Sequence, residues 1–256
     1  MRQMRILISN DDGIHAPGIE VLADAVAGLG EIDIVAPALE QSGASHSVTL
    51  NHPLRPLPVT RKGREFGLSV SGTPADCVKL AVHHLLPQPP DLILSGINRG
   101  SNAGICVIYS GTISAAAEGA ILGIPSIAFS LCSRDEPLHW ESAGHAARKV
   151  VENVAESGLP GDTMLSVNIP NLPVDQLRGF AVAPMGKSQY IDEFEERIDP
   201  RGNKYYWLVG DVHRADSSRR SDLDVLDDGY VSLTPIHFDL TDHESLERLN
   251  QWKLSL

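Results

Sequence analysis

Two adjacent carboxylates, Asp11 and Asp12, stand at the end of a short apolar run and are followed by Gly13. The run, residues 6–8, has the continuous apolar character of a buried parallel strand. Neighbouring carboxylates at a strand end repel each other unless positive charge lies beside them, and a divalent cation supplies that charge. A turn in which one aspartate caps a helix and the other faces water explains the pair equally well. The pair alone therefore leaves both a metal site and a plain turn open.

Polar side chains after two other expected strands supply the context. Ser42 follows the second expected strand, and Asn98 follows the third. Because the carboxyl ends of parallel strands meet at one edge of a sheet, both are expected near Asp11 and Asp12. Carboxylates, a hydroxyl and an amide carbonyl form an all-oxygen ligand set that suits Mg²⁺, Mn²⁺ or Ca²⁺ rather than Zn²⁺, with about two positions left for water and substrate. Taken singly, Ser42 and Asn98 have ordinary loop hydrogen bonds as the simpler explanation.

A glycine-spaced segment, residues 96–104, and the turn Ser110-Gly111-Thr112 indicate a place for an anion. Neither matches the dinucleotide fingerprint or the P-loop. Ser110 or Thr112 can cap the helix that follows, and Gly111 lets its backbone approach a ligand. The free amides and the dipole of a helix start attract phosphate. A plain capped helix is the simpler explanation of the turn, but a metal site at the same sheet edge favours the phosphate interpretation.

Other polar residues near these segments have structural explanations. Thr73, Pro74 and Asp76 have the spacing of a capped helix start, so we interpret Asp76 as half of a capping box. His46 lies close to Ser42 and is a candidate proton donor, although an ordinary loop histidine is the default interpretation. The GxSxG and HExxH motifs are absent.

The first half of the chain alternates strand patterns with helix patterns. Strands are expected at residues 6–8, 32–35, 92–94, 126–129 and 164–169. Helices are expected at about residues 18–27, 74–86, 112–122 and 139–156. The strand at 92–94 is expected to end at Ser95-Gly96. Such alternation builds right-handed βαβ units and a doubly wound parallel sheet, which makes this an α/β protein.

The second half of the chain has a different pattern. Strand-like segments occur at 180–183, 205–209 and 230–233, and a last helix is expected from 242 to about 252. The charged stretch 211–228 is interpreted mainly as a solvated loop. We expect one domain over residues 1–256, with an α/β core to about residue 180 and a β-rich extension from about 181. Extensions of this kind often pack against another subunit.

Composition excludes several classes of protein. With 21 Lys and Arg against 33 Asp and Glu the formal charge is −12, which argues against binding of a nucleic-acid polymer or an anionic membrane. No apolar run approaches the roughly 20 residues that span a bilayer, and the first residues lack the pattern of a signal peptide. Cys77, Cys106 and Cys132 have no CxxC spacing and are expected to be free thiols in a cytoplasmic protein.

Five ordered motifs resemble the SurE family of stationary-phase survival proteins, which are nucleoside-monophosphate phosphatases. They are NDDG at 10–13, AP with the following SG at 36–43, GTPADC at 72–77, SGINRG at 95–100 and YSGT at 109–112. A later segment, GYVSLTP at 229–235, is also similar, so the resemblance covers nearly the whole chain. It implies a Rossmann-like, doubly wound, mostly parallel sheet with a β-rich C-terminal extension that mediates homodimers or homotetramers.

The resemblance also implies site residues and a reaction. The family's metal ligands match Asp11, Asp12, Ser42 and Asn98. Its phosphate-binding residues match Asn102, Ser110, Gly111 and Thr112. The implied cofactor is one divalent cation per subunit, Mg²⁺ or Mn²⁺. The implied reaction is hydrolysis of nucleoside 5′-monophosphates, and in some members of 3′-monophosphates and short polyphosphate. A nucleotide as the substrate comes from the resemblance alone, whereas the residues themselves indicate a metal-dependent phosphate enzyme.

The expected catalytic residues are Asp11 and Asp12, one of which orients the attacking water or attacks phosphorus directly. Three other classes of protein are alternatives. A phosphoacceptor signalling domain needs a further aspartate at the end of the third strand, where this chain has Leu94 and Ser95. A zinc deacetylase starts with His-Pro-Asp-Asp and needs histidine ligands, whereas Asn10 precedes the pair here. A non-catalytic nucleotide-binding protein is separable only by turnover.

Overall fold

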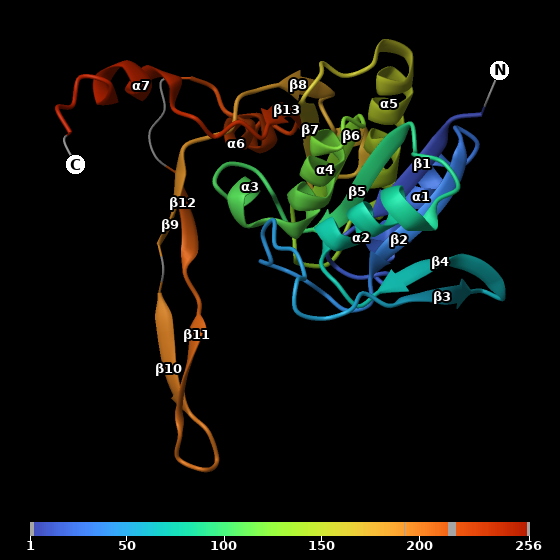
Figure 1. Ribbon diagram of the computed structural model, residues 1–256, viewed down its shortest axis with the longest axis horizontal. Coiled ribbons are helices and arrows are strands. Elements are labelled where there is room, and N and C mark those ends of the chain that lie inside the picture. The colour runs from blue at the N-terminus through green and yellow to red at the C-terminus, as the bar shows by residue number, and fades with distance from the viewer. Residues whose placement is uncertain (1–2, 192, 215–218, 255–256) are drawn as a thin grey trace.

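A mixed β-sheet with helices on both faces forms the centre of the protein (Figure 1). The computed structural model describes residues 3–191, 193–214 and 219–254. The strands are β1 Arg5–Ser9, β2 Glu31–Pro37, β3 Pro56–Arg61, β4 Arg64–Val70, β5 Leu92–Arg99, β6 Ser126–Leu131, β7 Thr163–Ile169, β8 Phe180–Val182, β9 Ser188–Ile191, β10 Phe194–Ile198, β11 Lys204–Leu208, β12 Asp211–Arg214 and β13 Val231–His237. The helices are α1 Pro17–Val26, α2 Pro74–Leu80 with a π-helical turn Ala81–Leu85, α3 Cys106–Tyr109, α4 Gly111–Ile121, α5 Trp140–Ser157, α6 Asp222–Asp227 and α7 His243–Leu249, with a 3₁₀ turn at Val174–Gln176.

The order of the strands defines where a ligand binds. The main sheet runs β3-β4-β2-β1-β5-β6-β7-β13-β8. Neighbouring strands from β4 across to β7 are parallel. The chain moves outward from β1 to β2 and β4, then returns to β5 on the other side of β1. The expected doubly wound, mostly parallel sheet is therefore confirmed, and its order reverses between β1 and β5, where such sheets bind ligands.

Both faces of the sheet are covered, which explains the continuous apolar run in β1. Ile6 and Ile8 pack with α1 and α5 in one cluster, and Leu7 packs with α2 and α4 in another. All three side chains are fully buried. Burial of each such side chain stabilises the fold by about 1.5–3 kcal/mol. The two layers of helices thus fix β1 firmly, and with it the residues at the carboxyl end of β1.

Strand β5 is longer than the sequence predicted. The expectation that this strand ends at Ser95-Gly96 is wrong, because β5 continues to Arg99 after an irregularity in its pairing with β6 between Ser95 and Asn98. A bulge of this kind bends a strand and redirects the side chains that follow it. Asn98 therefore lies within the strand rather than in a loop after it.

The hairpin of β3 and β4 was not predicted from the sequence. Strand β3 contains Pro56 and Pro58, which weaken a strand pattern because proline donates no hydrogen bond. In the structure β3 is the outermost strand of the sheet, paired only with β4. An edge position tolerates proline, so the two prolines explain both the weak signal and the place of the strand.

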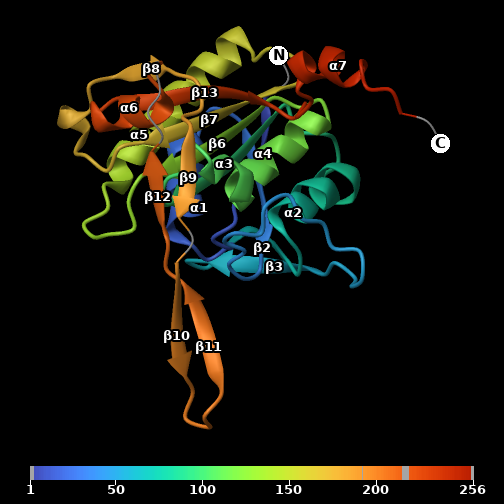
Figure 2. The same cartoon turned by 90° about the vertical axis from the view of Figure 1, so that its left-hand side faces the viewer.

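The C-terminal part forms the expected β-rich extension. Strand β13 pairs antiparallel with β7 and parallel with β8, so the extension first widens the main sheet. Strands β9 and β12, and then β10 and β11, pair antiparallel and form a long arm that projects from the body (Figures 1 and 2). The last helix, α7, is shorter than expected and is capped by Asp242, whose carboxylate accepts from the amides of Glu244 and Ser245.

The interpretation of residues 211–228 as mainly a solvated loop is wrong for most of the stretch that the structure describes. Strand β12 and helix α6 lie within it, and residues 215–218 lie outside the described residues. Asp222 and Val225 are buried. The carboxylate of Asp222 accepts hydrogen bonds from the amides of Gly104 and Gly186 at 2.9 and 2.8 Å. Its charge is therefore compensated by backbone donors inside the protein, which a charge pattern cannot reveal.

The three cysteines are free thiols, as expected. Burial raises the pKa of the Cys77 thiol well above its usual range and that of Cys132 to about 12, which disfavours the reactive thiolate form of both. Cys77 is a buried core residue, and Cys132 is partly buried. Among the residues that the structure describes, no helix combines the length and the apolar character needed to cross a bilayer.

Helix α1 approaches β5 at Gly18, where an added Cβ atom would lie 1.9 Å from the carbonyl oxygen of Ile97. Gly18→Ala must push α1 off the sheet, and we expect it to lower the free energy of unfolding by about 1–3 kcal/mol. Urea denaturation measures the change. Gly161→Ala is the matched control, since its Cβ would meet nothing within 4 Å. Equal stability of the two variants would contradict the close packing of α1.

Candidate active site

The carboxylate of Asp11 is buried between the end of β1 and the start of α4. Asp11 is 4 % exposed. The hydroxyl of Thr112 donates to its Oδ1 at 2.5 Å. Gly111 lies so close that an added Cβ would be 2.7 Å from Cβ of Asp11. The first turn of α4 therefore lies directly against this carboxylate, at the crevice where the strand order reverses.

Asp12 contacts the end of β5. Its Oδ2 accepts from the backbone amide of Arg99 at 3.2 Å. Asn98, the residue before, is 6 % exposed, and its amide nitrogen donates to the carbonyl of Gly100 at 2.9 Å. With the nitrogen engaged, the oxygen of the Asn98 amide is the atom left for a ligand. The irregular end of β5 thus places the Asn98–Arg99 segment beside the acidic pair.

Ser110 caps α4, and is thus the cap among the two candidates, Ser110 and Thr112, that the sequence left open. Its hydroxyl accepts from the amide of Ile113 at 3.1 Å. The hydroxyl of Ser114 donates to the carbonyl of Ser110 and reinforces the turn. The positive end of the α4 dipole therefore points into the crevice, where it favours an anion such as phosphate.

The surroundings of the acidic pair disfavour its ionised form. The pKa of Asp11 is raised to about 6. Burial is the main cause, the hydrogen bond from Thr112 lowers the pKa in part, and the negative charge of Asp12 adds to the rise. Burial also raises the pKa of Asp12, with the Arg99 amide lowering it and the charge of Glu40 raising it. Both carboxylates are thus destabilised in their ionised form, and a divalent cation bound between them would reverse this.

The oxygen-only surroundings fit a hard divalent cation. Over residues 3–191, 193–214 and 219–254, no group of three or more His, Cys, Asp or Glu side chains is arranged to hold a metal. A cation at Asp11 and Asp12 would therefore need neutral oxygen ligands in addition, and the amide oxygen of Asn98 is one that the structure brings near Asp12.

The loop that carries Ser42 contacts the acidic pair, but the Ser42 hydroxyl does not. The amide of its neighbour Gln41 donates to the carbonyl of Asp11 at 2.7 Å, so the loop after β2 is held against the acidic pair. The hydroxyl of Ser42 itself is exposed and donates to Glu40 at 2.6 Å. The structure thus brings the Ser42 loop to the site, with the hydroxyl turned to a different carboxylate.

Asn102 is tied to the sheet rather than to the crevice. Its backbone amide donates to Oδ1 of Asn168 at 2.9 Å, and its side-chain nitrogen donates to Ser130 at 2.8 Å. Both contacts fix the loop after β5 on β6 and β7. With its nitrogen engaged, the side chain would have to turn before it could donate to a phosphate oxygen.

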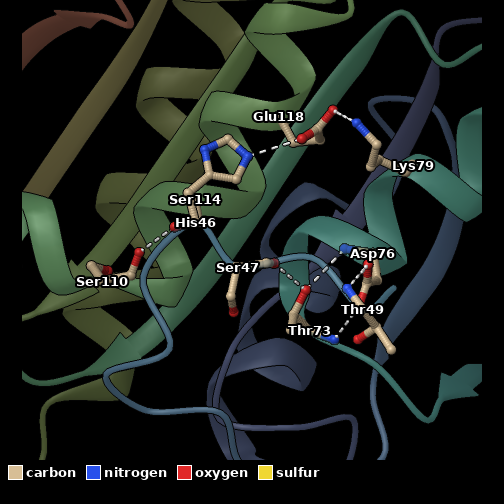
Figure 3. A network of polar contacts seen from close by, with 9 residues as sticks. All are labelled: His46, Ser47, Thr49, Thr73, Asp76, Lys79, Ser110, Ser114 and Glu118. Atoms are coloured by element: carbon tan, nitrogen blue, oxygen red, sulfur yellow. Dashed lines mark hydrogen bonds and ion pairs between the residues drawn. The ribbon is translucent and has the colours of Figure 1, made fainter. Parts of the chain in front are cut away.

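His46 contacts a buried glutamate that sequence reasoning missed (Figure 3). Its Nε2 lies 2.9 Å from Oε2 of Glu118, whose side chain is 3 % exposed, and Nζ of Lys79 lies 2.7 Å from the other oxygen. Although burial raises it, the hydrogen bonds from His46 and Lys79 hold the pKa of Glu118 below its ordinary value. The contact that the structure gives His46 is therefore structural, because it joins the loop after β2 to α4.

The same loop is fixed to α2 through the predicted capping box. The hydroxyl of Thr73 accepts from the amide of Asp76, and the Asp76 carboxylate accepts from the amide of Thr73, which confirms the box. Asp76 also accepts from the amide of Thr49, and Thr73 donates to the carbonyl of Ser47 (Figure 3). A loop without regular structure is thus anchored along its length, and Asp76 has the structural role that its spacing indicated.

The fold and the site together define a class of protein: a doubly wound α/β protein with a buried acidic pair and a helix start at the strand-order reversal. The family model described as "Survival protein SurE" matches residues 6–192. The chain belongs to the SurE family.

Similar proteins support this membership over the full length. A protein named 5′-nucleotidase SurE from Syntrophobacter fumaroxidans is 45% identical over 251 residues, covering 98% of this chain and 100% of the relative. One of the same name from Chlorobium chlorochromatii is 47% identical over 249 residues, covering 97% of this chain and 91% of the relative. The crystal structure of the SurE protein from Aquifex aeolicus superposes with a TM-score of 0.82 at 40% identity, covering 96% of this chain and 98% of that one.

The raised pKa of Asp11 predicts how pH acts on the metal-free protein. Between its ordinary value of 3.8 and about 6, the folded state holds a proton that the unfolded state has released, so stability falls as pH rises through this window. The loss amounts to about 3 kcal/mol at most, from roughly two pKa units. Asp11→Asn removes this titration, so in EDTA the variant should be more stable than the parent at pH 8, and the difference should vanish near pH 4.

Urea denaturation in EDTA at the two pH values measures this effect. The exposed Asp24→Asn is the matched control and should follow the parent. An Asp11→Asn variant that is less stable than the parent at pH 8 would show that the ionised carboxylate is well compensated without a cation.

Proposed function

We propose that this protein is a divalent-metal-dependent phosphatase that hydrolyses nucleoside 5′-monophosphates to nucleoside and phosphate. The chain is a phosphoric monoester hydrolase of the SurE type, as its full-length relatives named 5′-nucleotidase SurE support. The observation that carries the proposal is the buried carboxylate of Asp11 against the first turn of α4, beside Asp12. This arrangement supports a cation site and an anion site within one crevice.

The proposed ligands of the cation are oxygens from three elements: Asp11 and Asp12 after β1, Ser42 after β2 and Asn98 in β5. Ser42 would need only to rotate its hydroxyl from Glu40 toward the acidic pair, since its loop is already held to Asp11 by the amide of Gln41. We propose one cation per subunit, Mg²⁺ or Mn²⁺, because both favour six oxygen ligands and leave positions for water and substrate.

A bound divalent cation supplies charge neutralisation to the phosphoryl group as it loosens from its leaving oxygen. The residues of the chain bind and orient the phosphate. The first turn of α4, with Ser110, Gly111 and Thr112, holds the phosphate oxygens with amides and hydroxyls, and Asn102 joins it after turning its amide. Thr112 also keeps Asp11 in place. Preorganised donors of this kind stabilise the charge that develops on equatorial oxygens.

In this proposal the acidic pair positions the water that attacks phosphorus. Asp12 is less buried than Asp11 and is fixed by the amide of Arg99, so we assign Asp12 the orientation of the water. Asp11 is held by Thr112 and serves the cation. Direct attack by one carboxylate is the alternative, and trapping of a phosphorylated aspartate would distinguish it.

The substrate range and setting follow from the relatives and the residues. The name 5′-nucleotidase of the relatives gives the 5′-monophosphates, and the family resemblance extends the proposal to 3′-monophosphates and short polyphosphate. The free cysteines suit a reducing compartment, so we place the protein in the cytoplasm.

The arm is the proposed contact between subunits. Every residue of β10 and β11 is exposed, including the large apolar side chains of Phe194, Ile198 and Trp207. A two-stranded hairpin is at best marginally stable by itself in water, and exposed apolar patches mark contact surfaces. We propose that a second copy of the chain covers the arm in a homodimer or homotetramer.

Phosphate release from a panel of 5′- and 3′-monophosphates, ribose 5-phosphate and pyrophosphate tests the activity. We expect release in Mn²⁺ or Mg²⁺, a fall to background in EDTA, and recovery when the metal is returned. Asp11→Asn should lose turnover at least about 100-fold, because it removes charge from the cation site, while Asp24→Asn keeps it. Unchanged release in EDTA, or near-normal turnover of Asp11→Asn at saturating Mn²⁺, would refute the metal mechanism.

Light scattering coupled to gel filtration tests the arm. The parent should elute as a dimer or tetramer. Phe194→Glu combined with Trp207→Glu should shift it toward the monomer, because two buried and unpaired carboxylates disfavour association. Leu240→Glu, a change at an exposed apolar residue away from the arm, is the control. A monomeric parent would end the proposal.

A further inference from the structure

A small cavity opens on the Asp12 side of the crevice. Its volume is about 210 Å³, and the side chain of Asp12 forms part of its wall. A larger cavity of about 460 Å³ runs along α4, but neither Asp11 nor Asp12 lines it. The small cavity thus continues directly from the acidic pair.

The walls of the small cavity come from four separate segments. Asp12 and residues 16–18 belong to the segment between β1 and the start of α1. Glu40 belongs to the loop after β2, Arg99 ends β5, and Glu136, Leu138 and Trp140 belong to the segment that enters α5. Arg99 is held by this segment, since its guanidinium donates to the carbonyl of Arg134 at 2.5 Å and lies 3.5 Å from a carboxylate oxygen of Glu136. The cavity thus combines an apolar, aromatic side with two carboxylates besides Asp12.

The position of this cavity relative to the phosphate site determines what it can hold. The start of α4 lies against Asp11 and takes the phosphoryl group in the proposed function, whereas the cavity begins at Asp12. A phosphate monoester bound in the crevice must direct its alcohol away from the first turn of α4. The cavity beside Asp12 lies in the crevice away from that turn and is contiguous with the acidic pair.

The chemistry of the walls identifies the alcohol. Glu40, Glu136 and Asp12 are acidic, and Arg99 is already paired with Glu136. Such walls disfavour a second anionic group and accept hydrogen bonds from hydroxyls. Leu138 and Trp140 offer an apolar and aromatic surface, on which a planar base gains stacking energy. Pockets for drug-sized ligands are roughly 300–1,000 Å³, so this smaller cavity suits one compact group.

We infer that this cavity receives the nucleoside leaving group, with the base against Trp140 and the sugar hydroxyls toward Glu40 and Glu136. The inference rests on the proposed function and assigns Trp140 as a residue that determines specificity for the leaving group. A charged leaving group, as in pyrophosphate, is accordingly the poorer substrate.

The chain has three tryptophans, Trp140, Trp207 and Trp252, which makes a direct binding test available. Trp207 and Trp252 are exposed, so Trp207→Phe with Trp252→Phe leaves Trp140 as the only indole without disturbing the core. Adenosine should quench the fluorescence of this variant in a saturable way, and ribose should not. Absence of quenching by adenosine up to millimolar concentration would overturn the inference.

Kinetics provide the second readout. In Trp140→Leu, the ratio of kcat/KM for 5′-AMP to that for ribose 5-phosphate should fall about tenfold, the value of one base–aromatic contact, and Trp140→Phe should retain most of the ratio. Trp252→Leu is the matched control. A fall by the same factor for both substrates would mean that Trp140 only supports the fold, and the inference would be wrong.

The two readouts separate this inference from the proposed function. If the parent releases phosphate from neither substrate, the phosphatase proposal fails, and the quenching by adenosine still decides for or against a nucleoside in the cavity. If the parent hydrolyses both substrates with equal kcat/KM and adenosine does not quench, the phosphatase stands and the cavity does not hold the nucleoside.

Discussion

A carboxylate is buried beside another carboxylate, at the end of a strand that is covered on both faces. The rest of this structure depends on this one constraint. Asp11 is nearly inaccessible to solvent and accepts a short hydrogen bond from Thr112, and Asp12 follows it directly. Burial disfavours the ionised form of both groups. The ionised pair is therefore electrostatically unfavourable at this place, and the divalent cation of the proposed function would relieve it. The sheet, the helix start and the loops act together to keep this place fixed.

Two glycines allow the helices around the acidic pair to approach the sheet closely. Gly111 allows the first turn of α4 to touch Asp11, and Gly18 allows α1 to lie on β5 near its irregular end. The bend in β5 turns Asn98 and Arg99 toward Asp12. Each element is held from behind by core packing or by a polar anchor. The crevice is thus built from the ends of regular elements together with loops that side-chain contacts anchor, among them the loop after β2.

That loop shows how a segment without regular structure is made firm. The side chain of Glu118 in α4 is buried and joins His46 of the loop to Lys79 of α2. The capping box of Thr73 and Asp76 adds backbone contacts farther along. A buried carboxylate bound by a lysine and a histidine is costly to form and costly to break. It favours one arrangement of the loop that carries Ser42, which in turn defines the third side of the crevice and the position of Glu40.

Much of this could be predicted from the sequence, and the failures have physical reasons. The apolar run before Asp11 and the capping signals of Ser110 and Thr73 are local, so the parallel sheet and the helix starts could be predicted from short stretches. The order of the strands, with its reversal between β1 and β5, came from the structure. The position of Asn98 within β5 did not, because a bulge depends on pairing with a neighbouring strand.

Contacts between residues far apart in the chain could not be predicted from the sequence either. Glu118 looks like one charge on a helix rich in alanine, and Asp222 looks like one charge in a polar run. Both are buried because their partners, Lys79 and Gly104, come from distant parts of the chain. The nucleotide as the substrate was likewise suggested only by resemblance, since the residues around the acidic pair predict a metal and a phosphate but no particular alcohol.

The measurement that tests the central claim most directly is an anomalous difference map from a crystal of the protein soaked in Mn²⁺. The account predicts one strong peak per subunit, within bonding distance of the carboxylates of Asp11 and Asp12, and no such peak in a crystal of Asp11→Asn treated identically. A parent crystal without density at the acidic pair, or with Mn²⁺ bound only elsewhere, would contradict the account.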